Sequence, residues 1–153
     1  MAGKLGALIA AGGLALALAG AVSASTQLDN PGTIRITDRE VQRAKVDIGP
    51  SGHSAGDVES VRQLLYNQFI TSKPIGHTEL ICTYIDRDSR NCSGTYFMPQ
   101  GRIMVGGVIG TRLIFELAVL GGTGIYNNVR GTLTVTSLSV KPAREILVFR
   151  LVV

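Results

Sequence analysis

The stretch LICTYIDRDSRNCSGTYFMPQGRIMV, residues 80–105, alternates strand-forming residues with two short turns. Residues 86–88, Asp-Arg-Asp, suit a three-residue hairpin loop, and this loop places Cys82 directly opposite Cys92. Residues opposed on paired strands have Cβ atoms close enough for a disulfide. The stretch therefore predicts a β-hairpin with a cysteine pair across it.

The next turn continues the same pattern. Residues 98–101, Met-Pro-Gln-Gly, have proline and glycine at positions that a β-turn favours, and the turn pairs Tyr96 with Ile103. Connections this short join antiparallel strands. The stretch therefore predicts an antiparallel meander.

The rest of the chain has short segments rich in Val, Ile, Thr and Tyr, separated by turns that contain Gly and Pro. One segment has apolar residues that also recur at helical spacing, so a helix is the alternative there. We expect an all-β fold, an eight-stranded antiparallel calycin-like barrel, because closure removes exposed strand edges. The predicted strands are Thr33–Ile48 (broken in its middle), Val58–Phe69 (the segment with the helical alternative), Ile75–Ile85, Arg90–Phe97, Arg102–Ile109, Arg112–Leu120, Val129–Leu138 and Arg144–Val153.

The N-terminal segment has the form of a secretory signal peptide. Lys4 precedes an uncharged apolar run, and the run is followed by Val22-Ser23-Ala24, whose small residues suit a cleavage site. A membrane anchor is the alternative, but the run is short and rich in Ala and Gly. We expect residues 1–24 to be removed, residues 25–153 to form one domain, and the protein to be secreted.

Composition narrows the function classes. The chain has 15 Lys and Arg against 11 Asp and Glu, and the cations are scattered without aromatic platforms, which argues against nucleic-acid binding. His53 and His77 lie far apart, so we expect no metal site, and we expect no organic cofactor. Cys82 and Cys92 are an even pair in an oxidising compartment, where a disulfide is the default.

Strand alternation singles out a further acidic candidate. A two-residue turn at residues 110–111 would place Glu116 opposite Val105, on the face that also carries Cys82. If that face lines the barrel, Glu116 has a raised pKa and acts as a proton donor or acceptor, with Arg112 as its partner. If that face is the outside, both are solvated.

Three segments carry a resemblance to a known family. The first is FELAVLGGTGIY, residues 115–126, followed by Arg130-Gly131; the second is IGHTELIC, residues 75–82; the third is Gly56-Asp57-Val58 with Leu65-Tyr66. In this order they resemble the allene oxide cyclase and dirigent proteins. A phosphate-binding loop at the glycines is disfavoured because a strand, and not a helix, is expected to follow.

The resemblance implies an eight-stranded barrel with an apolar cavity, assembled as a trimer. Allene oxide cyclases shape the cyclisation of an epoxy fatty acid, and dirigent proteins steer the coupling of phenoxy radicals. In both, the pocket restricts the conformations of a reactive intermediate. The resemblance also places a carboxylate on the first strand, where Asp38 and Glu40 lie. We expect solvated surface for each, because isolated carboxylates are normally exposed, and Glu40 is kept as a candidate catalytic residue.

Three further residues are candidates for ligand binding. Tyr84 and Tyr96 would present hydroxyls to a cavity, although packing in the core is the alternative. Arg130 follows the glycine-rich turn at a position where dirigent proteins often carry Arg, and it could instead brace the turn.

The sequence therefore predicts a secreted barrel that binds an apolar small molecule and steers a cyclisation or radical coupling, with an isomerase-like, cyclase-like or dirigent-type activity. The alternatives are a non-catalytic, lipocalin-like carrier and a structural barrel with a filled core. A barrel with no cavity larger than a few water molecules would be neither a guiding barrel nor a carrier. A buried ionisable group beside tyrosines in such a cavity favours catalysis over carriage. The expected assembly is a homo-oligomer.

Overall fold

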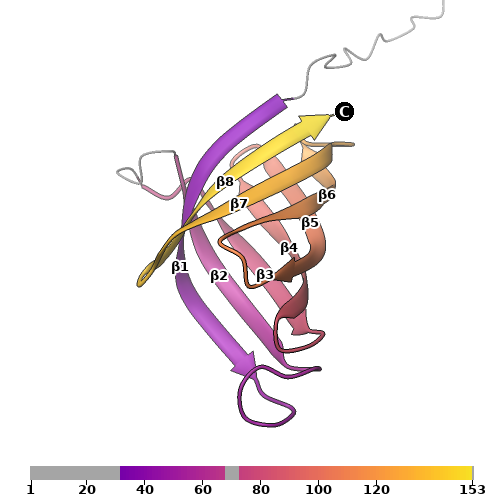
Figure 1. The fold of residues 1–153 in the computed structure, drawn as a ribbon. Helices are drawn as coiled ribbons and strands as arrows, with labels where there is room; N and C mark the ends of the chain where they lie inside the picture. The colour runs from indigo at the N-terminus through magenta and orange to yellow at the C-terminus, as the bar shows by residue number, and fades with distance from the viewer. Residues whose placement is uncertain (1–31, 68–72, 153) are drawn as a thin grey trace, which may run out of the picture.

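A computed structural model describes residues 32–67 and 73–152. They form a closed barrel of eight antiparallel strands in which each strand pairs with the next and β8 pairs with β1 (Figure 1). This confirms the predicted fold class; the expected signal peptide, residues 1–24, lies outside the described residues. The strands are β1 Gly32–Val46, β2 Val58–Tyr66, β3 Gly76–Tyr84, β4 Ser89–Met98, β5 Gly101–Gly110, β6 Ile114–Gly124, β7 Arg130–Val140 and β8 Ala143–Val152.

Four of the connecting loops lie at one end of the barrel, and the outer ends of the first and last strands lie at the other. The loops at residues 47–57, 85–88, 111–113 and 141–142 all connect strands at one end, which we call the mouth. The start of β1 and the end of β8 lie side by side at the opposite end (Figure 1). Within the described residues no helix is long and apolar enough to cross a membrane.

The predicted register of the first two hairpins is confirmed. Cys82 pairs with Cys92, and Tyr96 pairs with Ile103. The segment with a helical alternative is strand β2. The first strand is continuous, and the break expected in its middle is a register shift between Glu40 and Gln42.

The predicted turn at residues 110–111 is wrong. The β5–β6 connection spans residues 111–113, and Val105 pairs with Val119 rather than with Glu116, after a register shift just before Val105. Because successive side chains of a strand point to opposite faces, this changed register decides which residues of β6 are buried. Val119 faces the interior and Glu116 faces outward.

The barrel interior is mostly filled by side chains. Tyr96 and Phe149 pack edge to face, with ring centroids 5.1 Å apart, in the half of the barrel away from the mouth. Both are buried, as are the apolar side chains around them from β2, β5, β7 and β8. The remaining interior space therefore lies toward the mouth. The largest of the surrounding buried apolar side chains are Leu65, Ile103, Leu133 and Leu147.

Candidate functional site

Two carboxyl side chains meet inside the barrel. Asp38 on β1 lies directly opposite Glu145 on β8, and Asp38 is fully buried. Asp38 Oδ1 accepts a hydrogen bond from the backbone N–H of Glu145 at 3.1 Å, and Glu145 Oε2 accepts one from Gln63 Nε2 at 3.1 Å. Among the described residues, none donates to Asp38 Oδ2. One carboxyl oxygen thus has hydrogen-bonding capacity left over.

Burial keeps a proton on this pair. Burial first, and then the negative charge of Glu145, raises the pKa of Asp38 to about 9. Burial also raises the pKa of Glu145, although the hydrogen bond from Gln63 favours its ionised form. The two carboxyls titrate as a unit. At neutral pH the pair therefore holds a proton, because the raised pKa of Asp38 keeps this carboxyl protonated.

Tyr96 is the third member of this inner polar group. Its pKa is raised by burial and then by the charges of Asp38 and Glu145, so its hydroxyl keeps its proton. Edge-to-face packing on Phe149 orients the ring. The Tyr96 hydroxyl and the Asp38–Glu145 pair thus lie in the same part of the barrel interior.

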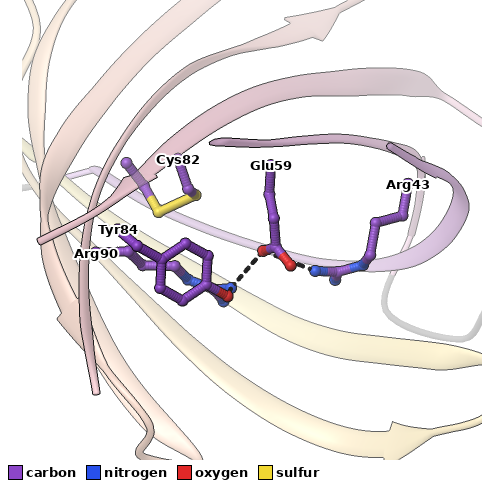
Figure 2. The surroundings of a disulfide bond; sticks show 6 residues. Arg43, Glu59, Cys82, Tyr84 and Arg90 are labelled. Carbon is purple, nitrogen blue, oxygen red and sulfur yellow. Dashed lines mark hydrogen bonds and ion pairs between the residues drawn. A yellow bond between two sulfur atoms is a disulfide. The ribbon is translucent and has the colours of Figure 1, made fainter. Parts of the chain in front are cut away.

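An ionic cluster lies closer to the mouth. The buried Glu59 carboxylate accepts hydrogen bonds from Arg43 at 3.0 Å and from Arg90 at 2.6 Å, so it lies between two guanidinium groups (Figure 2). Arg43 also pairs with Glu40 at 2.6 Å, and Arg90 donates to the Tyr84 hydroxyl at 2.9 Å. The two arginines balance the negative charges of Glu40 and Glu59. If one arginine moves away, Glu59 still pairs with the other.

The predicted disulfide is present. Cys82 and Cys92 are bonded to each other, and both side chains are buried inside the barrel (Figure 2). They line the wall of the inner cavity rather than the outer surface. Because both sulfurs are bonded, the cysteines supply a structural link and an apolar surface, and not a thiol.

The inner cavity has two kinds of wall. Gln63, Tyr96 and Glu145 form its polar side. Arg43 and Arg90 reach the cavity from the ionic cluster. Its volume is about 50 Å³, which accommodates only a few water molecules. Volume alone therefore favours the filled-barrel alternative, whereas a buried glutamate beside a tyrosine favours catalysis. The rest of the wall is apolar: Val61, Leu80, Cys82, Cys92, Ile109, Phe115, Leu117 and Val135.

A second pocket lies at the mouth, with a volume of about 160 Å³. One side is formed by the His53 ring, which stacks on Tyr84 with centroids 4.4 Å apart. The loop that carries His53 is held by the buried Asp57 carboxylate, which accepts hydrogen bonds from the backbone N–H groups of Ile48 and Ser54. The full lining is His53, Tyr84, Arg87, Asp88, Arg90, Ile109, Gly110 and Thr111.

Three of the sequence-predicted site residues face the interior or its ionic cluster. Tyr96 lines the inner cavity and Tyr84 lines the mouth pocket. Glu40 is half-buried and pairs with Arg43. The structure thus groups Tyr84 and Glu40 through the Arg43–Glu59–Arg90 cluster.

The other three lie away from both cavities. Glu116 is exposed on the outer face of β6 and accepts a hydrogen bond from the Thr134 hydroxyl at 2.9 Å. Arg112 is exposed in the β5–β6 loop, and Arg130 is exposed at the start of β7. The predicted placement of Glu116 and Arg112 on the face of Cys82 is wrong, because the longer loop and the register shift invert the faces of β6.

The inner carboxyls were missed by the sequence reasoning. Solvated surface was the expectation for Asp38, which is buried, and Glu145 was not singled out at all. A signal was present, because Asp38 alternates with Ile36, and Glu145 alternates with Leu147. A carboxylate in phase with buried apolar residues points inward.

The fold and the site together define a class of protein: a closed eight-stranded antiparallel barrel with a protonated carboxyl pair facing a small, partly apolar cavity. Within the described part of the chain, no group of three or more His, Cys, Asp or Glu side chains is placed to hold a metal ion.

Comparison with known proteins finds similar solved structures. No family model and no curated protein matches the chain. Among solved structures, pyocyanin demethylase is similar over 78% of this chain and 99% of its own, at 26% sequence identity and a TM-score of 0.68. A pterocarpan synthase dirigent protein covers 79% of this chain and 86% of its own, at 16% identity and a TM-score of 0.66.

A third similar structure is the Diels Alderase AbmU from Streptomyces koyangensis, over 77% of this chain and 63% of its own, at 16% identity and a TM-score of 0.63. At these identities the dirigent protein and the Diels Alderase support the barrel fold. The fold expected from the resemblance is therefore shared with a dirigent protein and with a cyclase-like barrel.

Proposed function

We propose that this barrel is an acid–base catalyst that binds a small, mainly apolar molecule and steers its rearrangement or cyclisation. The observation that carries the proposal is the buried Asp38–Glu145 pair beside a cavity whose other wall is apolar. A carrier needs the apolar wall but has no use for a buried pair that holds a proton at neutral pH.

The geometry divides the roles. Glu145 lines the cavity and exchanges a proton with the ligand, whereas Asp38 lies opposite Glu145 and is a positioning residue that keeps the pair protonated. The pair donates a proton to an acceptor oxygen of the ligand and takes one back from a neighbouring carbon, so no proton or electron is consumed overall. Tyr96 donates a hydrogen bond to the same oxygen, and the apolar wall restricts the conformations of the intermediate.

The similar structures support the same kind of chemistry. They include proteins described as a dirigent protein and as a Diels Alderase, and the structure with the higher identity is a demethylase. All three descriptions concern reactions of small molecules.

Hydrogen–deuterium exchange of acetone, a ketone small enough for the inner cavity, in D₂O, followed by NMR, tests the proposal. The exchange requires a proton donor at the carbonyl oxygen and an acceptor at the α-carbon. We expect the protein to accelerate it, and Glu145→Gln to lower the rate by about 10²- to 10⁴-fold. Glu79→Gln removes an exposed carboxylate of β3 and is the matched control, with an unchanged rate. A wild-type rate equal to that of buffer, or full activity in Glu145→Gln, would contradict the proposal.

We also propose that the chain is exported as residues 25–153 and assembles as a homo-oligomer. The disulfide supports export, because such bonds persist in oxidising compartments. Exposed apolar side chains on the outer wall support assembly.

A further inference from the structure

The mouth pocket and the inner cavity are separated by very little. Two residues, Arg90 and Ile109, line both of them. Ile109 is buried in the wall of β5, whereas Arg90 carries its guanidinium on a long flexible stem. Displacement of one side chain, that of Arg90, would therefore join the two spaces into a single site.

The mouth pocket has the chemistry of a site for an anion on a flat molecule. Arg87 and Arg90 bring two cations against the single carboxylate of Asp88, and Thr111 adds a hydroxyl. The stacked rings of His53 and Tyr84, only 7° from parallel, give the pocket a planar wall. Flat aromatic surfaces pack against such walls.

Arg90 already binds a carboxylate, that of Glu59 at 2.6 Å. Releasing it does not leave Glu59 unpaired, since Arg43 stays at 3.0 Å from the same oxygen. A carboxylate from a ligand would replace Glu59 at Arg90 like for like, with the planar geometry that a guanidinium prefers. The exchange therefore leaves the ligand carboxylate paired with Arg90, and both Glu59 and Glu40 paired with Arg43.

We propose that the mouth pocket binds a carboxylate of the substrate, and that Arg90 turns from Glu59 to this carboxylate and so opens the way to the inner cavity. The inference rests on the proposed function and deepens it by naming the substrate class. The substrate is a flat, mainly apolar carboxylic acid, with the carboxylate at Arg90 and a hydrogen-bond acceptor at the Asp38–Glu145 pair.

Binding of two matched probes tests this. 2-Naphthoate and 2-naphthamide have the same shape and differ in charge, and calorimetry gives the Kd of each. We expect naphthoate to bind about tenfold tighter than naphthamide. Arg90→Met, which keeps an apolar stem, removes this preference and leaves naphthamide binding within about twofold of wild type. Arg62→Met on the outer face of β2 is the matched control and keeps the preference.

A second variant keeps the test decisive if Arg90→Met does not fold, as judged by circular dichroism. Glu59→Gln removes the internal competitor, so it should tighten naphthoate binding several-fold and leave naphthamide unchanged. Equal affinity of the wild-type protein for both probes, or an unchanged preference in either Arg90→Met or Glu59→Gln, would overturn the inference.

The outcome is separable from that of the proposed function. Glu145→Gln should retain the preference for naphthoate, because Glu145 lies outside the mouth pocket. A naphthoate preference without acetone exchange means that the carboxylate site exists and the acid–base proposal fails. Exchange of the ketone without a preference for naphthoate means that the acid–base proposal holds and the carboxylate site fails.

Discussion

At the scale of the residue, burial turns Asp38 into an acid. Its side chain is enclosed by β1 and β8, its nearest ionisable neighbour is another carboxyl, and none of the described cations forms an ion pair with it. Asp57 has the opposite surroundings. Backbone N–H donors, chiefly that of Ile48, lower the pKa of Asp57, and Lys45 adds to the effect. An aspartate side chain is thus protonated in the barrel interior, at Asp38, and is a hydrogen-bond acceptor that holds a loop, at Asp57.

The Asp38 pKa has a consequence for stability. The folded-state pKa is raised to about 9 from an ordinary value of 3.8, so the native state binds more protons than the unfolded state between these values. The contribution to stability is complete below pH 4 and is lost as the pH rises toward 9. The slope for one proton is at most about 1.4 kcal/mol per pH unit.

We expect Asp38→Asn to remove this slope, because the amide cannot ionise. The variant should gain stability relative to wild type as the pH rises, with a larger difference at pH 8 than at pH 5. Urea unfolding at several pH values between 5 and 9 measures the effect. Glu79→Gln should keep the wild-type slope, since Glu79 is exposed. An unchanged slope in Asp38→Asn would assign the pH dependence to another group.

At the scale of the element, the glycine-rich segment at residues 121–124 completes β6 and begins the turn into β7. Gly124 has a φ of 66°, in the left-handed region, and a Cβ on it would overlap the carbonyl oxygen of Gln100. At Gly122 the φ is ordinary, but a Cβ would overlap the carbonyl oxygen of Tyr126. The segment is thus a structural feature of the end opposite the mouth, and its glycines bring three backbone segments together.

Gly124→Ala should lower the free energy of unfolding by at least about 1–2 kcal/mol, from the left-handed conformation alone. The overlap with Gln100 adds to this cost. Gly32→Ala is the matched control, because a Cβ there has no atom within 4 Å, and it should change stability by less than about 0.5 kcal/mol. Chemical denaturation compares the two variants. Equal stabilities would mean that the turn relaxes freely.

At the scale of the whole molecule, closure pairs each of the eight described strands with two neighbours, which favours assembly through the outer wall over assembly through strand edges. Part of this wall is apolar on β3, β5 and β6. Leu120 packs over Gly106, and Met104 lies beside Gly121, so the side chains form a continuous surface across β5 and β6. We call this surface, with its neighbours, the outer apolar patch: Ile81, Met104, Val108 and Leu120, each between 45% and 62% exposed.

Native mass spectrometry of protein recovered from the culture medium tests export and assembly together. We expect a subunit mass that corresponds to a chain starting near Ser25, and an oligomer rather than a monomer. Leu120→Glu places a charge in the outer apolar patch and should shift the protein toward monomers. Thr33→Glu, on the exposed outer face of β1, is the matched control and should leave the oligomer intact. A monomer in the wild-type protein would contradict the proposed assembly.

Much of the fold is determined by the sequence itself, because short turns act locally. The three residues between Ile85 and Ser89 are enough to pair Cys82 with Cys92, and the pairing is observed. Eight strand-like segments with short connections are likewise enough to predict the barrel.

Only the tertiary structure decided where the candidate site lies. The register of β6 depends on a shift beside Val105 and on a loop of residues 111–113, and this register sends Glu116 outward. Closure of β8 onto β1 brings Asp38 against Glu145, which are 107 residues apart in the chain. Local sequence patterns indicate which residues share a face of a strand. They do not indicate which residues of the first and last strands pair when the barrel closes. That long-range pairing places the two carboxyls of the candidate site together.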